Sequence, residues 1–171
     1  MKIIKAKEKD SVEISKIYAQ SWKIAYKNDI PKQYLDNLKE DFWVETFNEW
    51  LSTNKVEALL AYINNKPVGS IAYGSGRDDK YKTWGEIISL YSLEEVWGTK
   101  VGYELISAAV KNLYENKYYN IYLWVLNENE RAKNFYKRFG FIETDDELHF
   151  EIQGKKLFDK RFIYKHEKYS A

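Results

Sequence analysis

The centre of the chain alternates strand-like and helical segments, and this order constrains the fold more than any other feature. Strand-like runs at 83–93 (TWGEIISLYSL) and 118–126 (YYNIYLWVL) each precede a helical pattern, at 98–115 and 129–139. Two strands joined through a helix can pair in parallel, because the helix returns the chain across one face of the sheet. We therefore predict an α/β (α+β) fold with a mixed central β-sheet and helices on its faces.

The flanking segments supply the other elements. A strand at 2–8 is followed by apolar residues at helical spacing over 12–22. We expect Asp10 or Ser11 to cap that helix, with Glu13 completing a capping box. Two further short helices are expected over 28–51. A β-hairpin that turns at Asn-Asn-Lys follows over 55–74, and a second hairpin closes the chain over 141–166.

Composition excludes several classes of protein. The 171 residues predict a single domain, 1–171, and a net charge of +1 does not indicate a nucleic-acid partner. The chain has no cysteine and two histidines, which argues against disulfides, thiolate nucleophiles, a metal site and a Ser-His-Asp triad. It also lacks an apolar run of the roughly 20 residues that a membrane helix needs. We expect a soluble cytoplasmic protein with no membrane association.

The stretch EEVWGTKVGYEL, residues 94–105, joins the first central strand to its helix. A helix that begins directly after a strand presents unpaired N–H groups and the positive end of its dipole, which suits an anion. Gly98 and Gly102 would let a phosphate approach the backbone. The alternative is a loop glycine followed by a glycine that allows close helix packing. Lys100 either adds a cation beside this site or is solvated. The stretch is neither a Walker loop nor a Rossmann fingerprint.

A second group of residues lies in LNENERAKNFYKRFGF, at 126–141. At about 100° per residue, Asn129 and Tyr136 fall close together in projection, two turns apart. The neighbouring apolar face is expected to be core. The polar pair can therefore border a cleft; otherwise Asn129 caps the helix and Tyr136 places its hydroxyl at the surface.

Four segments of the chain resemble GNAT-type N-acetyltransferases. They are the helical region at 21–38, the strand and glycine stretch GEIISLYSLEEVWGTKVGYELI, the segment NENERAKNFYKRFGF, and the terminal hairpin. The third matches the family's Asn-x-x-Ala-x-x-Phe-Tyr-x-x-x-Gly-Phe pattern. The resemblance implies a GNAT-like acyl-CoA acyltransferase fold, whose V-shaped sheet is splayed between the strands that end near Leu93 and Leu126.

The resemblance also implies where acetyl-CoA, the expected co-substrate, would bind. Its pantetheine arm would hydrogen-bond the backbone of the first central strand, near Leu90–Ser92, and its pyrophosphate would meet the glycine stretch. Asn129 would contact the pantetheine arm, and Tyr136 would point at the sulfur. The cofactor-binding residues expected on this basis are Leu90, Tyr91, Ser92, Trp97, Gly98, Thr99, Lys100, Val101, Gly102, Tyr103, Asn129 and Tyr136.

Four residues depart from the family pattern. Trp97 replaces Gln or Arg, Lys100 replaces the middle glycine, Tyr103 replaces a small residue, and Glu94 replaces proline. These departures bear on the phosphate contacts rather than on the fold.

Acetyl transfer to an amine needs a neutral amine, a polarised thioester carbonyl and a proton for the leaving thiolate. Glu86 is our candidate general base, directly or through a water, and Tyr136 is the candidate general acid. Backbone N–H groups near Tyr91 or Ser92 would polarise the carbonyl. The alternative is that Glu86 pairs with a lysine or faces outward. Aromatic residues that can line the acceptor entry, or else belong to the core, are Trp22, Tyr26, Tyr34, Tyr73 and Trp84.

The leading interpretation is an N-acetyltransferase that moves the acetyl group of acetyl-CoA to a primary amine of a small molecule, peptide or protein. Attack is direct, within a ternary complex, because no covalent intermediate is suggested. A non-catalytic acyl-CoA sensor on the same fold and a different nucleotide-using α/β enzyme are the alternatives. The sequence does not identify the amine. A homodimer is compatible with an exposed terminal hairpin.

Overall fold

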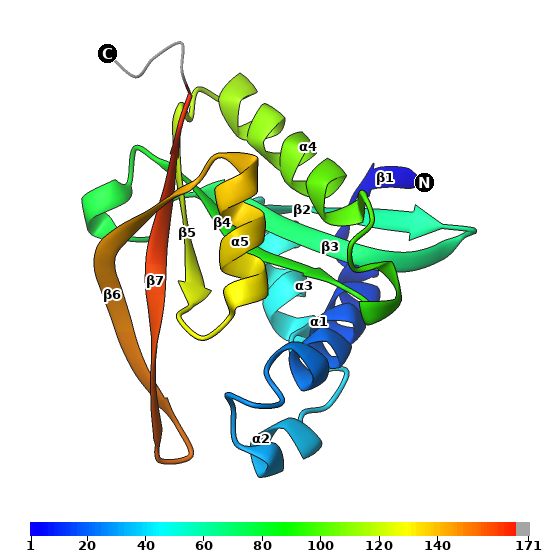
Figure 1. The fold of residues 1–171 in the computed structure, drawn as a ribbon. Coiled ribbons are helices and arrows are strands. Elements are labelled where there is room, and N and C mark those ends of the chain that lie inside the picture. The colour runs from blue at the N-terminus through cyan, green and yellow to red at the C-terminus, as the bar shows by residue number, and fades with distance from the viewer. Residues whose placement is uncertain (167–171) are drawn as a thin grey trace.

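A single mixed β-sheet organises the protein, in a computed structural model that describes residues 1–166 (Figure 1). Its seven strands lie in the order β1-β2-β3-β4-β5-β7-β6. The strands are β1 Lys2–Lys5, β2 Val56–Ile63, β3 Lys66–Ser75, β4 Gly85–Ser92, β5 Asn120–Leu126, β6 Ile142–Ile152 and β7 Lys155–Lys165. The helices are α1 Ser11–Ala25, α2 Lys32–Asp36, α3 Val44–Ser52, α4 Val101–Glu115 and α5 Glu130–Phe139, with 3-10 turns η1 Glu8–Asp10, η2 Asp79–Tyr81 and η3 Glu94–Val96.

Helices cover both faces of the sheet, as the alternating pattern predicts. On one face the apolar stripe of α4 (Val101, Leu105, Ala109 and Leu113) packs in a core that α5 also joins. On the other face α3 packs on β2, and α1 packs on β3, β4 and α3, with Phe47 fully buried. Each helix therefore buries one stripe against the sheet, which is what drives the layers together.

The sheet opens between β4 and β5, its only parallel pair among the strands described. These strands pair in register only from Gly85 and Ile121 to Ile87 and Leu123. Directly after the last pair, Ile88 is an extra residue against β3, because Ala72 faces Ser89 while Tyr73 faces Ile87. A bulge of this kind bends a strand. The splayed, V-shaped sheet expected from the sequence is confirmed.

Two local predictions are wrong. The carboxylate of Asp10 accepts a hydrogen bond from the Lys7 backbone N–H (2.8 Å) and does not cap α1. Helix α4 begins at Val101 rather than at Gly98, because Gly98 has a φ of +74°, in the left-handed region that a right-handed helix cannot use. The first difference removes only a side-chain contact, because α1 still begins at Ser11 with Asp10 at its N-cap position. The second moves the start of α4, and neither changes the order of elements.

Both hairpins and the end of α5 follow the sequence prediction. Asn64 and Asn65 turn the first hairpin with positive φ angles of 49° and 62°, as a tight two-residue turn requires. Gly140, with a φ of 122°, ends α5. No helix within residues 1–166 is long and apolar enough to cross a membrane.

Candidate active site

A cavity of about 600 Å³ occupies the opening between β4 and β5. Its walls come from β4, β5, the start of α4, α5, the end of α1 and the β6–β7 hairpin. Most of the site residues predicted from the sequence line it: Trp22, Tyr26, Glu86, Leu90, Tyr91, Ser92, Trp97, Gly98, Thr99, Gly102, Asn129 and Tyr136. Segments distant in the chain thus meet at the point where the sheet splits.

The other predicted cofactor-loop residues do not line the cavity. The side chain of Val101 is buried in the core, where its methyl group would touch a Cβ added at Gly69. Lys100 is exposed at the N-cap of α4. Tyr103 is also exposed and packs beside Phe139. The residues of this loop that line the cavity are Trp97, Gly98, Thr99 and Gly102.

Three of the predicted acceptor-side aromatics also lie outside the cavity. Tyr73 is buried, and its hydroxyl accepts a hydrogen bond from Asn112 (2.7 Å). Trp84 stacks edge-on against Tyr81. Tyr34 packs against the apolar cluster that contains Tyr26 and the end of the terminal hairpin. Of the five aromatics, Trp22 and Tyr26 are the ones that face the cavity.

One backbone edge of β4 is free along the cavity. From Gly69 and Ser92 to Ile71 and Leu90, β4 pairs with β3 on its other side. Towards β5 the pairing stops at Ile87. Peptide groups on that edge are therefore open to a ligand that adds as an extended strand.

The start of α4 is a cradle of free donors. Within residues 1–166, the backbone N–H groups of Gly98, Lys100, Gly102 and Tyr103 have no hydrogen-bond acceptor, whereas that of Val101 reaches Thr99 Oγ1 (3.3 Å). Nothing lies within 4 Å of the position that a Cβ at Gly98 would take. Free N–H groups at the N-terminus of a 15-residue helix suit an anion such as pyrophosphate.

Arg131, which the sequence analysis did not select, supplies a cation beside this cradle. Its guanidinium carbon lies 3.6 Å from the centroid of the Trp97 ring, and both residues line the cavity. Trp97 is held in turn by a hydrogen bond from its Nε1 to the Ser92 carbonyl (3.0 Å). Burial lowers the pKa of Arg131, and no carboxylate in the described part of the chain pairs with it. Stacking on Trp97 thus holds a cation beside position 97, where the family pattern has Gln or Arg.

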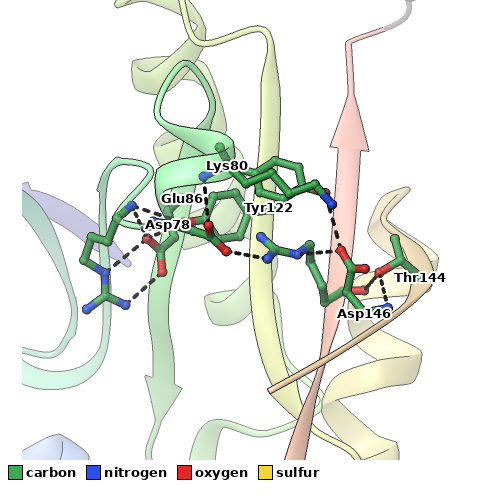
Figure 2. A network of polar contacts seen from close by, with 9 residues as sticks. Asp78, Lys80, Glu86, Tyr122, Thr144 and Asp146 are labelled. Carbon is green, nitrogen blue, oxygen red and sulfur yellow. Dashed lines mark hydrogen bonds and ion pairs between the residues drawn. The ribbon is translucent and has the colours of Figure 1, made fainter. Parts of the chain in front are cut away.

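Glu86, the candidate base, is buried and fully engaged (Figure 2). Its Oε2 accepts from the Arg77 backbone N–H (3.0 Å), Arg77 Nε (3.1 Å) and the Tyr122 hydroxyl (2.9 Å). Its Oε1 accepts from Arg77 Nη2 (2.8 Å). The carboxylate therefore forms a bidentate ion pair, a geometry that favours its charged form. The sequence analysis gave a lysine as the alternative partner of Glu86, and the structure has Arg77 in that place.

The same network continues to Asp78 and Asp146, which Figure 2 labels and which contact buried Arg161. Arg161 donates from Nη2 to Asp78 Oδ2 (2.6 Å), and its Nε lies 3.1 Å from Asp146 Oδ2. The guanidinium also stacks among Tyr81, Tyr122 and Trp124 at 4.0–4.7 Å. These contacts tie the 77–81 segment and β6 to β7, and so fix the wall that carries Glu86.

Tyr136 extends from α5 into the cavity with a hydroxyl that makes no hydrogen bond in the described structure. Burial, followed by the neighbouring Tyr91, raises its pKa well above the usual value. Its phenol is therefore protonated throughout the physiological range and available as a donor. Asn129 also lines the cavity and lies at the N-terminal end of α5. Its side chain caps this helix by accepting a hydrogen bond from the Ala132 N–H (3.2 Å).

Trp22, Tyr26 and Tyr91 form an aromatic part of the cavity wall. The Tyr26 and Tyr91 hydroxyls lie 3.3 Å apart, and Trp22 packs edge-on against Tyr26. Burial raises the pKa of Tyr26 to about 12 and raises the pKa of Tyr91 well above its usual value, so both hydroxyls are neutral.

Asp159 is a second cavity carboxylate that sequence analysis missed. It lies in β7, and burial, assisted by the charge of Glu128, raises its pKa to about 6. One signal was available: strand alternation puts Asp159 on the same face as apolar Leu157, where a carboxylate is unusual. No group of three or more potential metal ligands is found within residues 1–166.

Comparisons with known proteins agree with this geometry. A family model described as the acetyltransferase (GNAT) family matches residues 17–141. The uncharacterized N-acetyltransferase YuaI of Bacillus subtilis is 28% identical over 153 residues, which are 89% of this chain and 86% of that protein.

Two solved structures share the fold. PaiA N-acetyltransferase from Thermoplasma acidophilum, in complex with coenzyme A, has a TM-score of 0.78 at 20% identity, over 97% of this chain and 100% of that one. YncA, a putative acetyltransferase from Salmonella typhimurium with its cofactor acetyl-CoA, has a TM-score of 0.75 at 16% identity, over 100% and 96%. The family match extends from α1 to the end of α5 and includes every segment that forms the splayed cavity except the terminal hairpin. The chain belongs to the GNAT family of acetyltransferases.

Proposed function

We propose that this protein is an N-acetyltransferase that transfers the acetyl group of acetyl-CoA to a primary amine, by direct attack within a ternary complex. The observation that carries the proposal is the cavity at the splay. It is lined by a free strand edge, by free N–H groups at the start of α4, and by Arg131, which pairs with no carboxylate in the described part of the chain. The strand edge can bond amide groups, the N–H groups can bind a pyrophosphate, and the Arg131 guanidinium can bind a phosphate.

The residues present fit acetyl-CoA. The pantetheine amides would bond the free edge of β4 at Leu90–Ser92, and the pyrophosphate would accept from the N–H groups of Gly98 and Gly102. Arg131 would neutralise phosphate charge in place of a basic residue at position 97. Two fold relatives, PaiA and YncA, are described with coenzyme A and acetyl-CoA, which supports this assignment.

Tyr136 is the proposed donor to the departing sulfur. A thiol has a pKa of about 8.5 and an unperturbed phenol of about 10, so a buried phenol is the weaker acid of the two. Tyr136 therefore cannot surrender its proton permanently to the thiolate. It would donate a hydrogen bond as charge develops on sulfur, and would pass a proton on only while regaining one from the amine nitrogen. N–H groups on the free edge of β4 would polarise the thioester carbonyl.

Thiol release from acetyl-CoA, measured across a panel of primary amines, tests the proposal. We expect Tyr136→Phe to lower kcat by about 10- to 100-fold while changing the Kd for CoA by less than about 2-fold, because the phenyl ring keeps its packing. The opposite pattern, intact kcat with weakened CoA binding, would remove the donor role. Tight CoA binding without turnover of any amine would instead identify a non-catalytic acyl-CoA sensor.

A further inference from the structure

The cavity holds two carboxylates, and their surroundings differ. Glu86 accepts four hydrogen bonds from Arg77 and Tyr122. Asp159 makes no hydrogen bond or ion pair with any side chain among residues 1–166. A partly buried carboxylate without a partner is unfavourable unless a ligand supplies the partner.

Within residues 1–166, no cation pairs with Asp159 or lowers its pKa, although Arg77, Arg131 and Arg138 also line the cavity. Tyr26 at the end of α1 and Tyr91 on β4 interact with it as neutral phenols, and the charge of Glu128, in the loop before α5, opposes its ionisation. Its cross-strand partners are Leu126 on β5 and Leu148 on β6. Asp159 therefore retains a proton to about pH 6, because of burial first and of Glu128 second.

Apolar and aromatic side chains surround this end of the cavity. Trp22, Ala25 and Ile30 reach it from the α1–α2 region, and Leu148 and Phe150 from β6. The two regions pack together through a cluster that includes Ile30, Leu157 and Phe150. Figure 1 shows the tip of the β6–β7 hairpin and α2 on the same side of the molecule, away from α4.

We propose that Asp159 binds the ammonium group of the acceptor and takes its proton, and that the acceptor is a monoamine with an apolar or aromatic body. This inference rests on the proposed acetyltransferase function and adds the acceptor class and the base. One unpaired carboxylate among apolar walls matches one cation. A polyamine would bring further cations that no other free carboxylate of the cavity could pair.

The protons balance as follows. Asp159 accepts one proton from the ammonium and passes it to solvent. The neutral nitrogen attacks the thioester carbon, so that a C–N bond forms and the C–S bond breaks. A second proton leaves the nitrogen and reaches the sulfur through Tyr136. The products are the acetamide, the CoA thiol and one released proton. Because its pKa is raised, Asp159 is a stronger base than an exposed aspartate.

The test compares Asp159→Asn with Asp145→Asn, which alters an exposed aspartate of β6, and with Glu86→Gln. The acceptor probes are 2-phenylethylamine and spermidine. In the wild type we expect kcat/KM to fall as the pH drops below about 6, where Asp159 becomes protonated; this fall is the acidic limb of the pH profile. For Asp159→Asn we expect kcat/KM with 2-phenylethylamine to fall about 100-fold, and the acidic limb to disappear. Asp145→Asn should behave as the wild type, Glu86→Gln should keep the limb, and Asp159→Glu should recover part of the activity.

Binding is measured separately from turnover, by calorimetric titration of 2-phenylethylamine and neutral 2-phenylethanol into CoA-saturated protein. The inference is supported if Asp159→Asn loses binding of the amine but keeps binding of the alcohol. This holds even if the wild type shows no turnover, because missing turnover would count against the proposed acetyltransferase function and not against amine binding by Asp159. The inference is overturned if Asp159→Asn binds the amine normally, if Glu86→Gln rather than Asp159→Asn removes the limb, or if spermidine has the higher kcat/KM.

Discussion

At the scale of single residues, Arg131 and Trp97 illustrate how one substitution is offset by another part of the chain. A tryptophan at position 97 cannot pair with phosphate, but its ring holds the Arg131 guanidinium 3.6 Å from its centroid. Because Arg131 lies within the cavity wall and is free of carboxylates in the described structure, its charge remains available to a ligand. Guanidinium groups bind phosphate in two-point contacts that an ammonium cannot reproduce.

Arg131→Ala should therefore weaken CoA binding by about 10-fold or more, the loss expected for a charged hydrogen bond of ~1.5–3 kcal/mol. Arg131→Lys should recover little of the CoA affinity, since an ammonium group neither stacks on an aromatic ring as a guanidinium does nor forms bidentate hydrogen bonds with phosphate. Equilibrium titration of CoA is the measurement, and Lys111→Ala, which removes an exposed cation of α4, is the control. Equal CoA affinity in Arg131→Ala and the control would show that Arg131 does not reach the phosphates.

At the scale of elements, the splay depends on where β4 leaves β5 and where α4 begins. Pairing of the two strands ends at Ile87, the bulged Ile88 follows, and the positive φ of Gly98 sets the start of α4. The strand edge and the helix N-terminus are consequently exposed to the same cavity. A mutation at this junction should affect CoA binding more than stability.

Gly102→Glu should reduce CoA affinity by about 10-fold or more, because it brings a negative charge to the helix end at which phosphate is expected. Gly102→Ala is the matched control: its Cβ would touch the Phe135 ring at 3.4 Å, an ordinary contact, so its effect should be small. CoA titration together with thermal unfolding separates binding from folding. If Gly102→Glu binds CoA as well as Gly102→Ala does, the pyrophosphate lies elsewhere.

At the scale of the whole molecule, the ionisation of Asp159 couples the cavity to folding stability. The folded-state pKa of about 6 exceeds the ordinary value of 3.8, so the native protein holds this proton more tightly than the unfolded chain. Between about pH 4 and pH 6 the unfolded chain loses the proton first, and the contribution of Asp159 to stability falls as pH rises.

Asp159→Asn should accordingly raise the free energy of unfolding at pH 7.5 by ~1–2 kcal/mol, a value reduced from the full shift because the carboxyl is partly exposed. Near pH 4 the variant and the wild type should be equally stable, since both side chains are neutral there. Denaturant unfolding at the two pH values measures this. A stabilisation of equal size at both values would mean that the carboxylate's charge is not its cause.

Prediction from sequence succeeded where the signal is local. The α4 stripe, the Asn-Asn turn and the Gly140 stop are each specified by residues adjacent in the chain, and all three are found. The capping box at Asp10 failed because the Lys7 N–H offered that carboxylate another donor. Val101 and Tyr103 were predicted to bind cofactor because they lie within the loop motif, but the helix turns their side chains into the core and into solvent.

The amino-acid sequence by itself determined the order of strands and helices, the mixed sheet, and the loop and helix that border the cavity, because periodicity, glycines and turn residues act over a few positions. The splay of the sheet was expected only from the resemblance to the GNAT family. Only the tertiary structure decided which charges meet. Arg77 closes on Glu86, Arg131 stacks on Trp97, and Asp159 is left without a partner. The first two are contacts between separate segments of the chain, and the third is the absence of a contact in the described structure. None of the three follows from neighbouring residues, because each depends on how the whole sheet and its helices pack.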